Sequence, residues 1–240
     1  MKIKKIFWLF FVGIFVFSLF GSLLVKNLSE KDSIEKIEYI VYYKKNFSKL
    51  AGNAKLRTST CYAFLSPSKV KWPSTASYVI NPINSQGLSE DFIKSAISQS
   101  AETWDSATSK EIANDNYTID TTAVYGKRDG KNAIVFGDNY QDPNVIGVTS
   151  VWYNTRTRAI LEFDMSFEED FKWGDASQDS SLMDLQNIAT HELGHAFGMG
   201  DIYKDACSAV TMYGYSDYGE IEKRTLEQPD IKGLQTLYGF

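Results

Sequence analysis

The chain has 240 residues, of which 43% are hydrophobic and 14% aromatic, and its formal net charge at pH 7 is −5. This length and apolar content favour one well-buried domain over two. The lysines and arginines are scattered and form no basic stripe with interleaved aromatic residues, so no nucleic-acid partner is expected.

The first 25 residues differ from the rest of the chain. Three lysines, Lys2, Lys4 and Lys5, precede an uncharged apolar run of twenty residues from Ile6 to Val25. A secretory signal usually has about 7 to 15 apolar residues, whereas about 20 can span a bilayer as a helix. We therefore expect residues 1–25 to be an uncleaved signal anchor, with a cleaved signal peptide as the alternative. Either interpretation predicts an extracytoplasmic protein, anchored in the membrane by its N-terminus or secreted.

Residues 26–60 are rich in lysine, serine and glutamate, with one apolar patch, IEYIVYY, at 37–43. This composition predicts a stem or spacer that is poorly ordered in parts. The folded domain is expected over residues 61–240.

Several elements of this domain are predicted by hydrophobic periodicity. SYVIN at 77–81 is the expected first strand, and a helix is expected to begin at Ser89. Its apolar residues follow at helical spacing: Ile93, Ala96, Ile97, Ala101 and Trp104. Residues 132–137, 147–154 and 158–167 are rich in β-branched and aromatic side chains and predict three further strands.

The strand at 158–167 alternates between apolar and mainly polar residues, which predicts one face in the core and one mostly in water. Only Thr155 to Arg158 separate it from the preceding strand, so we expect an antiparallel hairpin. A second helix is predicted to start near Ser180 or Ser181, with Asp184 in its first turn. A short terminal helix with Pro229 at its start is expected to close the chain.

The segment HELGHAFGMGD at 191–201 contains the only two histidines, His191 and His195. On a helix, residues four apart lie on one face, so both imidazoles can bind one metal ion. Glu192 would lie beside that metal, where it can take a proton from the attacking water. The alternative is that both histidines are ordinary helix residues, but this separation with a glutamate between them is improbable by chance.

A hydrolytic zinc site needs three protein ligands and one open position. Gly198 lets the chain leave the helix and turn back, because glycine tolerates positive φ. Asp201, three residues later, is the candidate third ligand, since a carboxylate is an acceptable ligand of zinc. Met212 follows eleven residues after Asp201, and the metzincin pattern places a Met-turn after the last ligand. Met212 is therefore expected to lie beneath the ligands.

With these residues the chain resembles the metzincins, and most closely the matrixin-type peptidases found outside animals. The resemblance covers about 170 residues and includes HELGHAFG, TMY, AETW, NAIVFG, ILEFD and LEQPDIKGLQTLYG. It implies an α+β catalytic domain: a twisted mixed sheet with an antiparallel edge strand, two long helices and a short C-terminal helix. It also implies one catalytic zinc ion and peptide or protein substrates.

The chain departs from animal matrixins in three ways. Asp201 replaces their histidine, and no histidines remain for a structural zinc site. Calcium is a second candidate cofactor, with Asp138, Asp142, Asp175 and Asp179 as its acids, but their spacing matches no calcium loop; a solvated acidic loop is the favoured interpretation. The inhibitory PRCGxPD sequence is also absent.

The two cysteines, Cys61 and Cys207, predict one disulfide in an exported chain. The alternative is that Cys61 binds the zinc as a thiolate and keeps the enzyme latent. Both alternatives stay open at the level of the sequence.

By analogy with metzincins, the strand at 158–167 is the expected edge strand that pairs with an extended substrate. Tyr213 could donate its hydroxyl to the oxyanion or pack in the wall, and residues 213–224 are expected to form the outer wall of the substrate pocket. The favoured function is a zinc endopeptidase with Glu192 as general base. The alternatives are a catalytically silent binding module and a peptidase limited to self-processing.

Overall fold

The computed structural model describes residues 33–43 and 61–240. The expected signal anchor at 1–25 and most of the expected stem lie outside these ranges. Among the described residues, no helix combines the length and the apolar character that a bilayer crossing requires.

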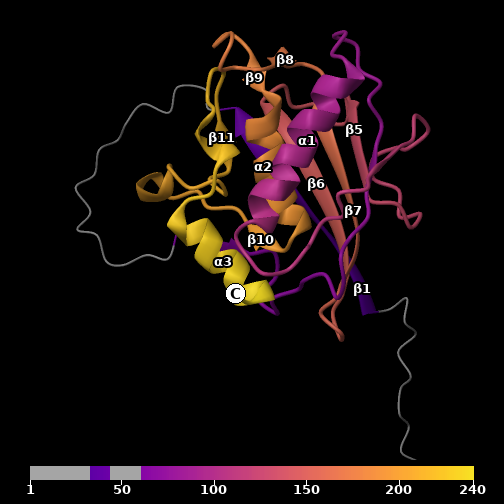
Figure 1. Ribbon diagram of the computed structural model, residues 1–240, viewed down its shortest axis with the longest axis vertical. Coiled ribbons are helices and arrows are strands. Elements are labelled where there is room, and N and C mark those ends of the chain that lie inside the picture. Colours follow the sequence, from indigo (N-terminus) through magenta and orange to yellow (C-terminus); the bar gives the residue numbers. More distant parts are fainter. Residues whose placement is uncertain (1–32, 44–60) are drawn as a thin grey trace, which may run out of the picture.

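The chain forms three α-helices and eleven short or long strands within the described ranges (Figure 1). The helices are α1 (Glu90–Asp105), α2 (Leu185–Ala196) and α3 (Gln228–Tyr238). The strands are β1 (Ile34–Tyr43), β2 (Ala63–Phe64), β3 (Val79–Ile80), β4 (Thr118–Ile119), β5 (Ala133–Gly137), β6 (Val145–Asn154), β7 (Ile160–Glu168), β8 (Trp173–Gly174), β9 (Met183–Asp184), β10 (Met199–Gly200) and β11 (Tyr215–Ser216). Two 3-10 helices, η2 (Asp205–Cys207) and η3 (Glu222–Arg224), lie between α2 and α3.

Seven strands form one mixed sheet in the order β11-β1-β6-β7-β5-β3-β4. β6 is antiparallel to both of its neighbours, and all the other pairs in the sheet are parallel. α2 packs across β6, β1 and β7, and α1 packs on α2 on the same side of the sheet (Figure 1). This arrangement confirms the predicted α+β class with a mixed sheet and three helices.

Helices α1 and α3 begin where the sequence predicts. Ser89 is the N-cap of α1, and its hydroxyl accepts a hydrogen bond from the backbone N–H of Phe92. The predicted apolar stripe of α1, from Ile93 to Trp104, is buried against α2. Pro229 lies in the first turn of α3, where its missing N–H costs nothing.

The start of α2 was predicted a few residues too early. Ser180 and Ser181 belong to a turn that Asp179 closes, since its carbonyl accepts from the Leu182 N–H and its carboxylate from the Ser181 N–H. The N-cap is Asp184, whose carboxylate accepts from the backbone N–H of Asn187. Serine and aspartate are equally good N-caps, so propensity could not choose between them.

The predicted stem is wrong for residues 34–43, which form a ten-residue strand. β1 pairs with β6 from Ile34↔Asn154 to Tyr42↔Val145, and its end pairs in parallel with β11 at Tyr42↔Tyr215. Charged residues in this segment suggested a spacer. The side chains of Lys36 and Glu38 are exposed, while Val41 is fully buried.

The expected edge strand is also corrected. The hairpin of β6 and β7 is antiparallel as predicted, but β7 lies in the middle of the sheet, between β6 and β5. The supposedly wet face of β7 is buried, because the loop at 126–130 covers it. Glu162 accepts from the N–H groups of Asp129 and Gly130, and Asp164 from those of Gly126 and Lys127. The alternation predicted that water would solvate these carboxylates, but backbone N–H groups of the loop donate the hydrogen bonds instead.

Candidate metal centre

His191 and His195 lie one turn apart on α2, and their Nε2 atoms are 3.2 Å apart. The side chains of both are completely buried. The Nδ1 atom of His191 lies 2.7 Å from the carbonyl oxygen of Thr211, and that of His195 lies 3.0 Å from the carbonyl oxygen of Met199. A carbonyl can only accept, so each Nδ1 carries the proton and each Nε2 keeps a free lone pair.

Asp201 reaches the two histidines because the chain reverses after α2. Gly198 has a φ of 98°, which a side chain would strain, and an added Cβ would lie 2.5 Å from the carbonyl oxygen of Val70. The following strand β10 pairs antiparallel with β2 and carries the chain back to the histidines. The Oδ1 atom of Asp201 then lies 3.3 Å from Nε2 of His191 and 3.4 Å from Nε2 of His195.

These three atoms fit a tetrahedral zinc ion. Ligand bonds of about 2.0 to 2.1 Å at tetrahedral angles give ligand separations of about 3.3 Å, close to the three observed distances. The Oδ1 atom of Asp201 is buried and has no hydrogen-bond partner, while Oδ2 accepts from the Tyr203 hydroxyl at 2.9 Å. Among the described residues, His191, His195 and Asp201 are the group of metal-binding side chains close enough to share an ion.

Glu192 lies beside this group and contacts none of the three ligand atoms through a hydrogen bond. Its side chain is fully buried, Oε2 accepts from the Thr149 hydroxyl on β6, and Oε1 has no partner. Burial raises the pKa of its carboxyl, and the two histidines and Thr149 oppose that shift. A buried carboxylate oxygen with no partner is costly, and a cation or a reacting water at the site would satisfy it.

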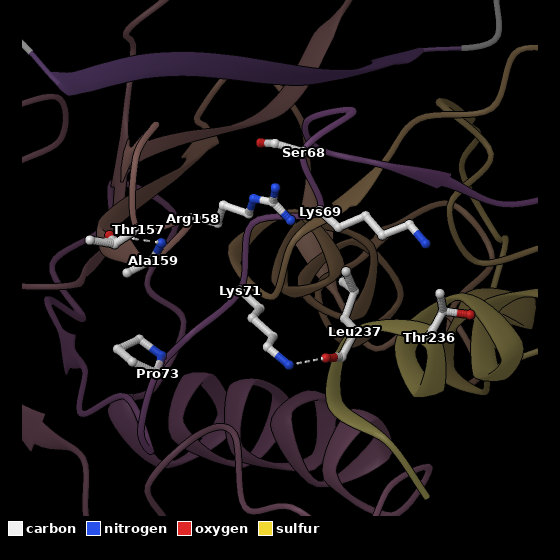
Figure 2. Close-up of a pocket in the computed structure, with 9 residues that line it drawn as sticks. All are labelled: Ser68, Lys69, Lys71, Pro73, Thr157, Arg158, Ala159, Thr236 and Leu237. Carbon is white, nitrogen blue, oxygen red and sulfur yellow. Dashed lines mark hydrogen bonds between the residues drawn. The ribbon is translucent and has the colours of Figure 1, made fainter.

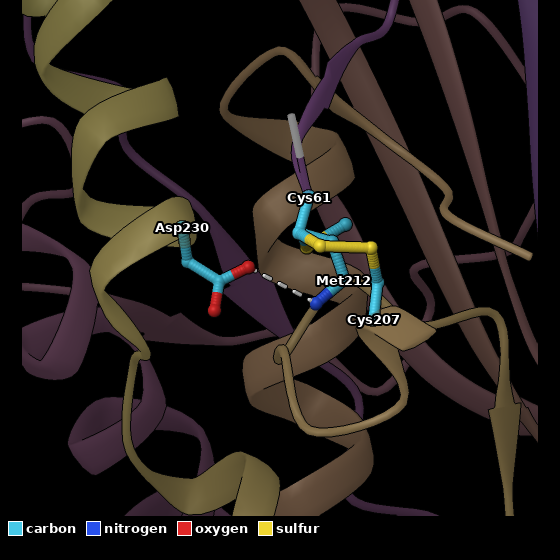
Figure 3. The surroundings of a disulfide bond; sticks show 4 residues. All are labelled: Cys61, Cys207, Met212 and Asp230. Carbon is cyan, nitrogen blue, oxygen red and sulfur yellow. Dashed lines mark hydrogen bonds between the residues drawn. A yellow bond between two sulfur atoms is a disulfide. The ribbon is translucent and has the colours of Figure 1, made fainter. Parts of the chain in front are cut away.

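Met212 is the residue that the sequence predicts to lie beneath the ligands. It is fully buried, and its sulfur occupies the space beside Gly194, where an added Cβ would come within 2.3 Å of it. Asp230 on α3 holds this turn, since its carboxylate accepts from the backbone N–H groups of Thr211, Met212 and Glu227 (Figure 3). The thioether of Met212 thus packs closely against α2, the helix that carries both histidines.

The comparisons with known proteins agree with this geometry. The model of the matrixin family, Peptidase_M10, matches residues 71–239. The chain belongs to the matrixin family. It is similar to human matrilysin, with 43% identity over 76 residues, which are 32% of this chain and 27% of matrilysin.

Two further matrixin relatives give the same result. Metalloendoproteinase 5-MMP of Arabidopsis thaliana is 25% identical over 196 residues, which are 80% of this chain and 52% of the relative. Human matrix metalloproteinase-25 is 36% identical over 77 residues, or 32% of this chain and 13% of the relative. The matched parts thus span about half the length of 5-MMP and less of the other two.

The two cysteines of this matrixin form a disulfide, and their Cα atoms are 5.5 Å apart. Figure 3 shows the bond beside Met212, with Cys207 on the segment that precedes Met212. Both sulfurs are bonded to each other, so the structure does not place a Cys61 thiolate at the metal group. The bond instead ties the start of the 61–240 segment to the site.

Two of the predicted residue sets do not belong to the metal group. Tyr213 is buried with Ile202, Cys207 and Val210, and its hydroxyl donates to Asp205 at 3.2 Å, an arrangement that matches wall packing. Of the candidate calcium acids, Asp175 pairs with Arg224 and accepts from Ser177. Sequence reasoning missed Thr149, Tyr203 and Asp230, because their roles depend on contacts between distant segments.

A surface pocket on this matrixin domain lies beside the C-terminal end of α3 (Figure 2). Lys69, Lys71 and Arg158 supply its charges, and Lys71 donates to the carbonyl oxygen of Leu237 at 2.6 Å. No histidine, cysteine or carboxylate lines it. This pocket therefore cannot provide the metal ligands or the base, and the metal group on α2 remains the candidate site.

Proposed function

We propose that the protein is a zinc-dependent endopeptidase that hydrolyses peptide bonds of proteins outside the cytoplasm. One observation supports this proposal above the others: beside three ligand atoms at zinc spacing, Glu192 has a buried carboxylate oxygen with no partner. A closed structural zinc site has no use for such a carboxylate.

In this proposal His191, His195 and Asp201 hold one zinc ion, which when bound polarises the substrate carbonyl and makes water more acidic. Glu192 takes a proton from the attacking water at Oε1 and passes it to the leaving amine. Thr149 holds Oε2, which orients the carboxylate and leaves Oε1 for the transfer. The carbonyls of Thr211 and Met199 fix both imidazole rings.

The strand beside the metal group is β6, which carries Thr149. Gly147 on the same strand brings its backbone close to the base, since a Cβ there would lie 3.2 Å from Oε1 of Glu192. An extended peptide paired with β6 would therefore pass over Glu192. Backbone pairing gives affinity with little demand on the substrate sequence.

The experiment compares the full chain with Glu192→Ala, each loaded with zinc, on a mixed peptide library. We expect both proteins to bind one equivalent of zinc and only the wild type, which retains Glu192, to cleave peptides. The rival function is a catalytically silent module. It predicts that the wild type and every variant that retains Glu192 bind one equivalent of zinc and cleave no peptide. Mass spectrometry of the same samples shows whether cleavage is confined to the protein itself.

A further inference from the structure

β1 occupies the place beside β6 that the proposed function assigns to a substrate. It pairs antiparallel with β6 along nine registered positions and in parallel with β11 at its end. β11 lies in the segment 213–224, the expected outer wall of the substrate pocket. β1 is thus held on both sides, as an extended peptide between these two strands would be (Figure 1).

The side chains of β1 contact the candidate site directly. The ring of Tyr39 stacks on the imidazole of His195 with ring centroids 4.3 Å apart, and its hydroxyl donates to the carbonyl of Leu65. Val41 pairs with Gly147, the residue whose backbone lies close to Glu192. With β1 in place, the side chains of His191, Glu192 and His195 are completely buried.

The residues of β1 are less buried than those of its neighbour β6, as expected for a bound peptide on the edge of a core. All ten residues of β6 are buried, whereas among the residues of β1 only Val41 is fully buried. The ring of Tyr43 packs edge-on against Tyr218, with centroids 5.6 Å apart, and at a tilt against Phe171, with centroids 5.8 Å apart. On the outer surface, Glu38 accepts hydrogen bonds from Ser150, Tyr125 and Tyr140.

We propose that residues 34–43 are an internal ligand of the peptide groove, the place between β6 and β11, and must leave it before another peptide can bind. This inference rests on the proposed peptidase function for its consequence, which is latency. It also identifies the substrate class, which is extended peptides. Such a peptide would have an aliphatic side chain in the buried position that Val41 occupies and an aromatic side chain two residues later, in the position of Tyr43. An enzyme whose groove is filled shows an affinity reduced by the small fraction of molecules with an open groove.

The test uses full-length variants that weaken β1 without adding a metal ligand. Val41→Pro removes a backbone N–H and fixes φ in the middle of a paired strand. Tyr43→Ala removes the ring that packs against Tyr218 and Phe171. Phe240→Ala is its matched control, because Phe240 is 92% exposed. The measurements are zinc content, hydrogen exchange of the β6 amides, and cleavage of a quenched fluorogenic peptide.

We expect Val41→Pro and Tyr43→Ala to keep one equivalent of zinc, to exchange the β6 amides faster, and to raise kcat/KM by about tenfold or more. Phe240→Ala should match the wild type. The synthetic peptide IEKIEYIVYY should bind Val41→Pro and inhibit it, and the same peptide with Val41→Pro should do neither. Binding by fluorescence anisotropy is independent of activity.

The outcomes separate the two proposals. Equal kcat/KM and equal β6 exchange in the wild type and both variants would overturn the internal-ligand proposal, even if all three cleave. Absence of cleavage in every protein with zinc bound would overturn the peptidase, while exchange and peptide binding still test occupancy of the groove. If Val41→Pro does not fold, Tyr43→Ala and its control decide the same question.

Discussion

The ring of Tyr39 lies almost parallel to the imidazole of His195, with 16° between the planes and 4.3 Å between the centroids. A residue far from the ligand motif in sequence therefore shields one of the expected zinc ligands. The contact is made by the aromatic ring, and the hydroxyl makes a separate hydrogen bond to Leu65.

Because the ring of Tyr39 covers His195, its removal should expose the metal to chelators. We expect Tyr39→Ala to release zinc to an excess of chelator about ten times faster than the wild type, as weakened contacts around metal ligands typically cost 10- to 100-fold. Tyr39→Phe keeps the ring and should release zinc at nearly the wild-type rate. A colorimetric zinc indicator follows both; equal rates for Ala and Phe would show that the ring does not shield the site.

Asp201 is the proposed third ligand, so Asp201→Ala should lose zinc at metal concentrations that saturate the wild type. Asp201→His supplies a nitrogen ligand in place of the carboxylate and should keep binding at least in part. Tyr203→Phe keeps the carboxylate but removes the hydrogen bond to Oδ2, and we expect about tenfold weaker binding. Competition with a chelator of known affinity measures all three, and full zinc retention by Asp201→Ala would contradict the assignment.

The ligand group could be predicted because its information is local. Helix geometry places two histidines four apart on one face, and a glycine at the end of their helix followed three residues later by an aspartate made Asp201 the candidate third ligand. The place of β1 could not be predicted in this way. The apolar residues of IEYIVYY are compatible with a strand, but the lysine, serine and glutamate content of residues 26–60 favoured a spacer, and the pairing partner is more than a hundred residues away.

The edge strand was mispredicted for a related reason. The alternation in β7 correctly showed two different faces, yet polar residues on one face do not by themselves indicate water. The carboxylates of Glu162 and Asp164 are buried because backbone N–H groups of the 126–130 loop satisfy them. Pairing order within a sheet is a property of distant segments, and periodicity describes only single segments.

Asp230 connects α3 to the turn that carries Met212, and its replacement should weaken the whole fold. Asp230→Ala leaves three backbone N–H groups without an acceptor, each costing about 1 to 3 kcal/mol when buried. We expect a loss of roughly 3 to 5 kcal/mol in the free energy of unfolding. Urea denaturation measures it, with Asp230→Asn expected to lie between the two. A change below about 1 kcal/mol would show that water replaces the carboxylate.

The disulfide between Cys61 and Cys207 joins residues separated by 146 positions, and it closes a long loop. Removal of such a bond by the double substitution Cys61→Ser and Cys207→Ser should lower the free energy of unfolding by about 2 to 5 kcal/mol. Zinc binding should survive, because neither sulfur belongs to the metal group. Intact mass should show alkylation of the wild type only after reduction. Two free thiols in the untreated protein would contradict the bond.

Glu168 gives the protein a defined dependence of stability on pH. Burial raises the pKa of this carboxyl to about 7, although the N–H groups of Tyr140 and Asn139 lower it, and Oε1 has no hydrogen-bond partner. The folded protein therefore holds a proton that the unfolded chain releases near pH 4, so the free energy of unfolding falls as the pH rises from about 4 to about 7. The contribution of Glu168 is at most about 1.4 kcal/mol per pH unit.

Glu168→Gln imitates the protonated acid, and its amide oxygen can accept the same two N–H groups. We expect this variant to match the wild type near pH 4.5 and to be more stable near pH 7.5, with a shallower pH dependence between them. Part of the slope should remain, because burial also raises the pKa of Asp164 to about 7. Urea denaturation across this range measures the slope for both proteins. Parallel curves would mean that Glu168 is ionised in the folded state throughout, since only a proton bound in the folded protein can produce the difference.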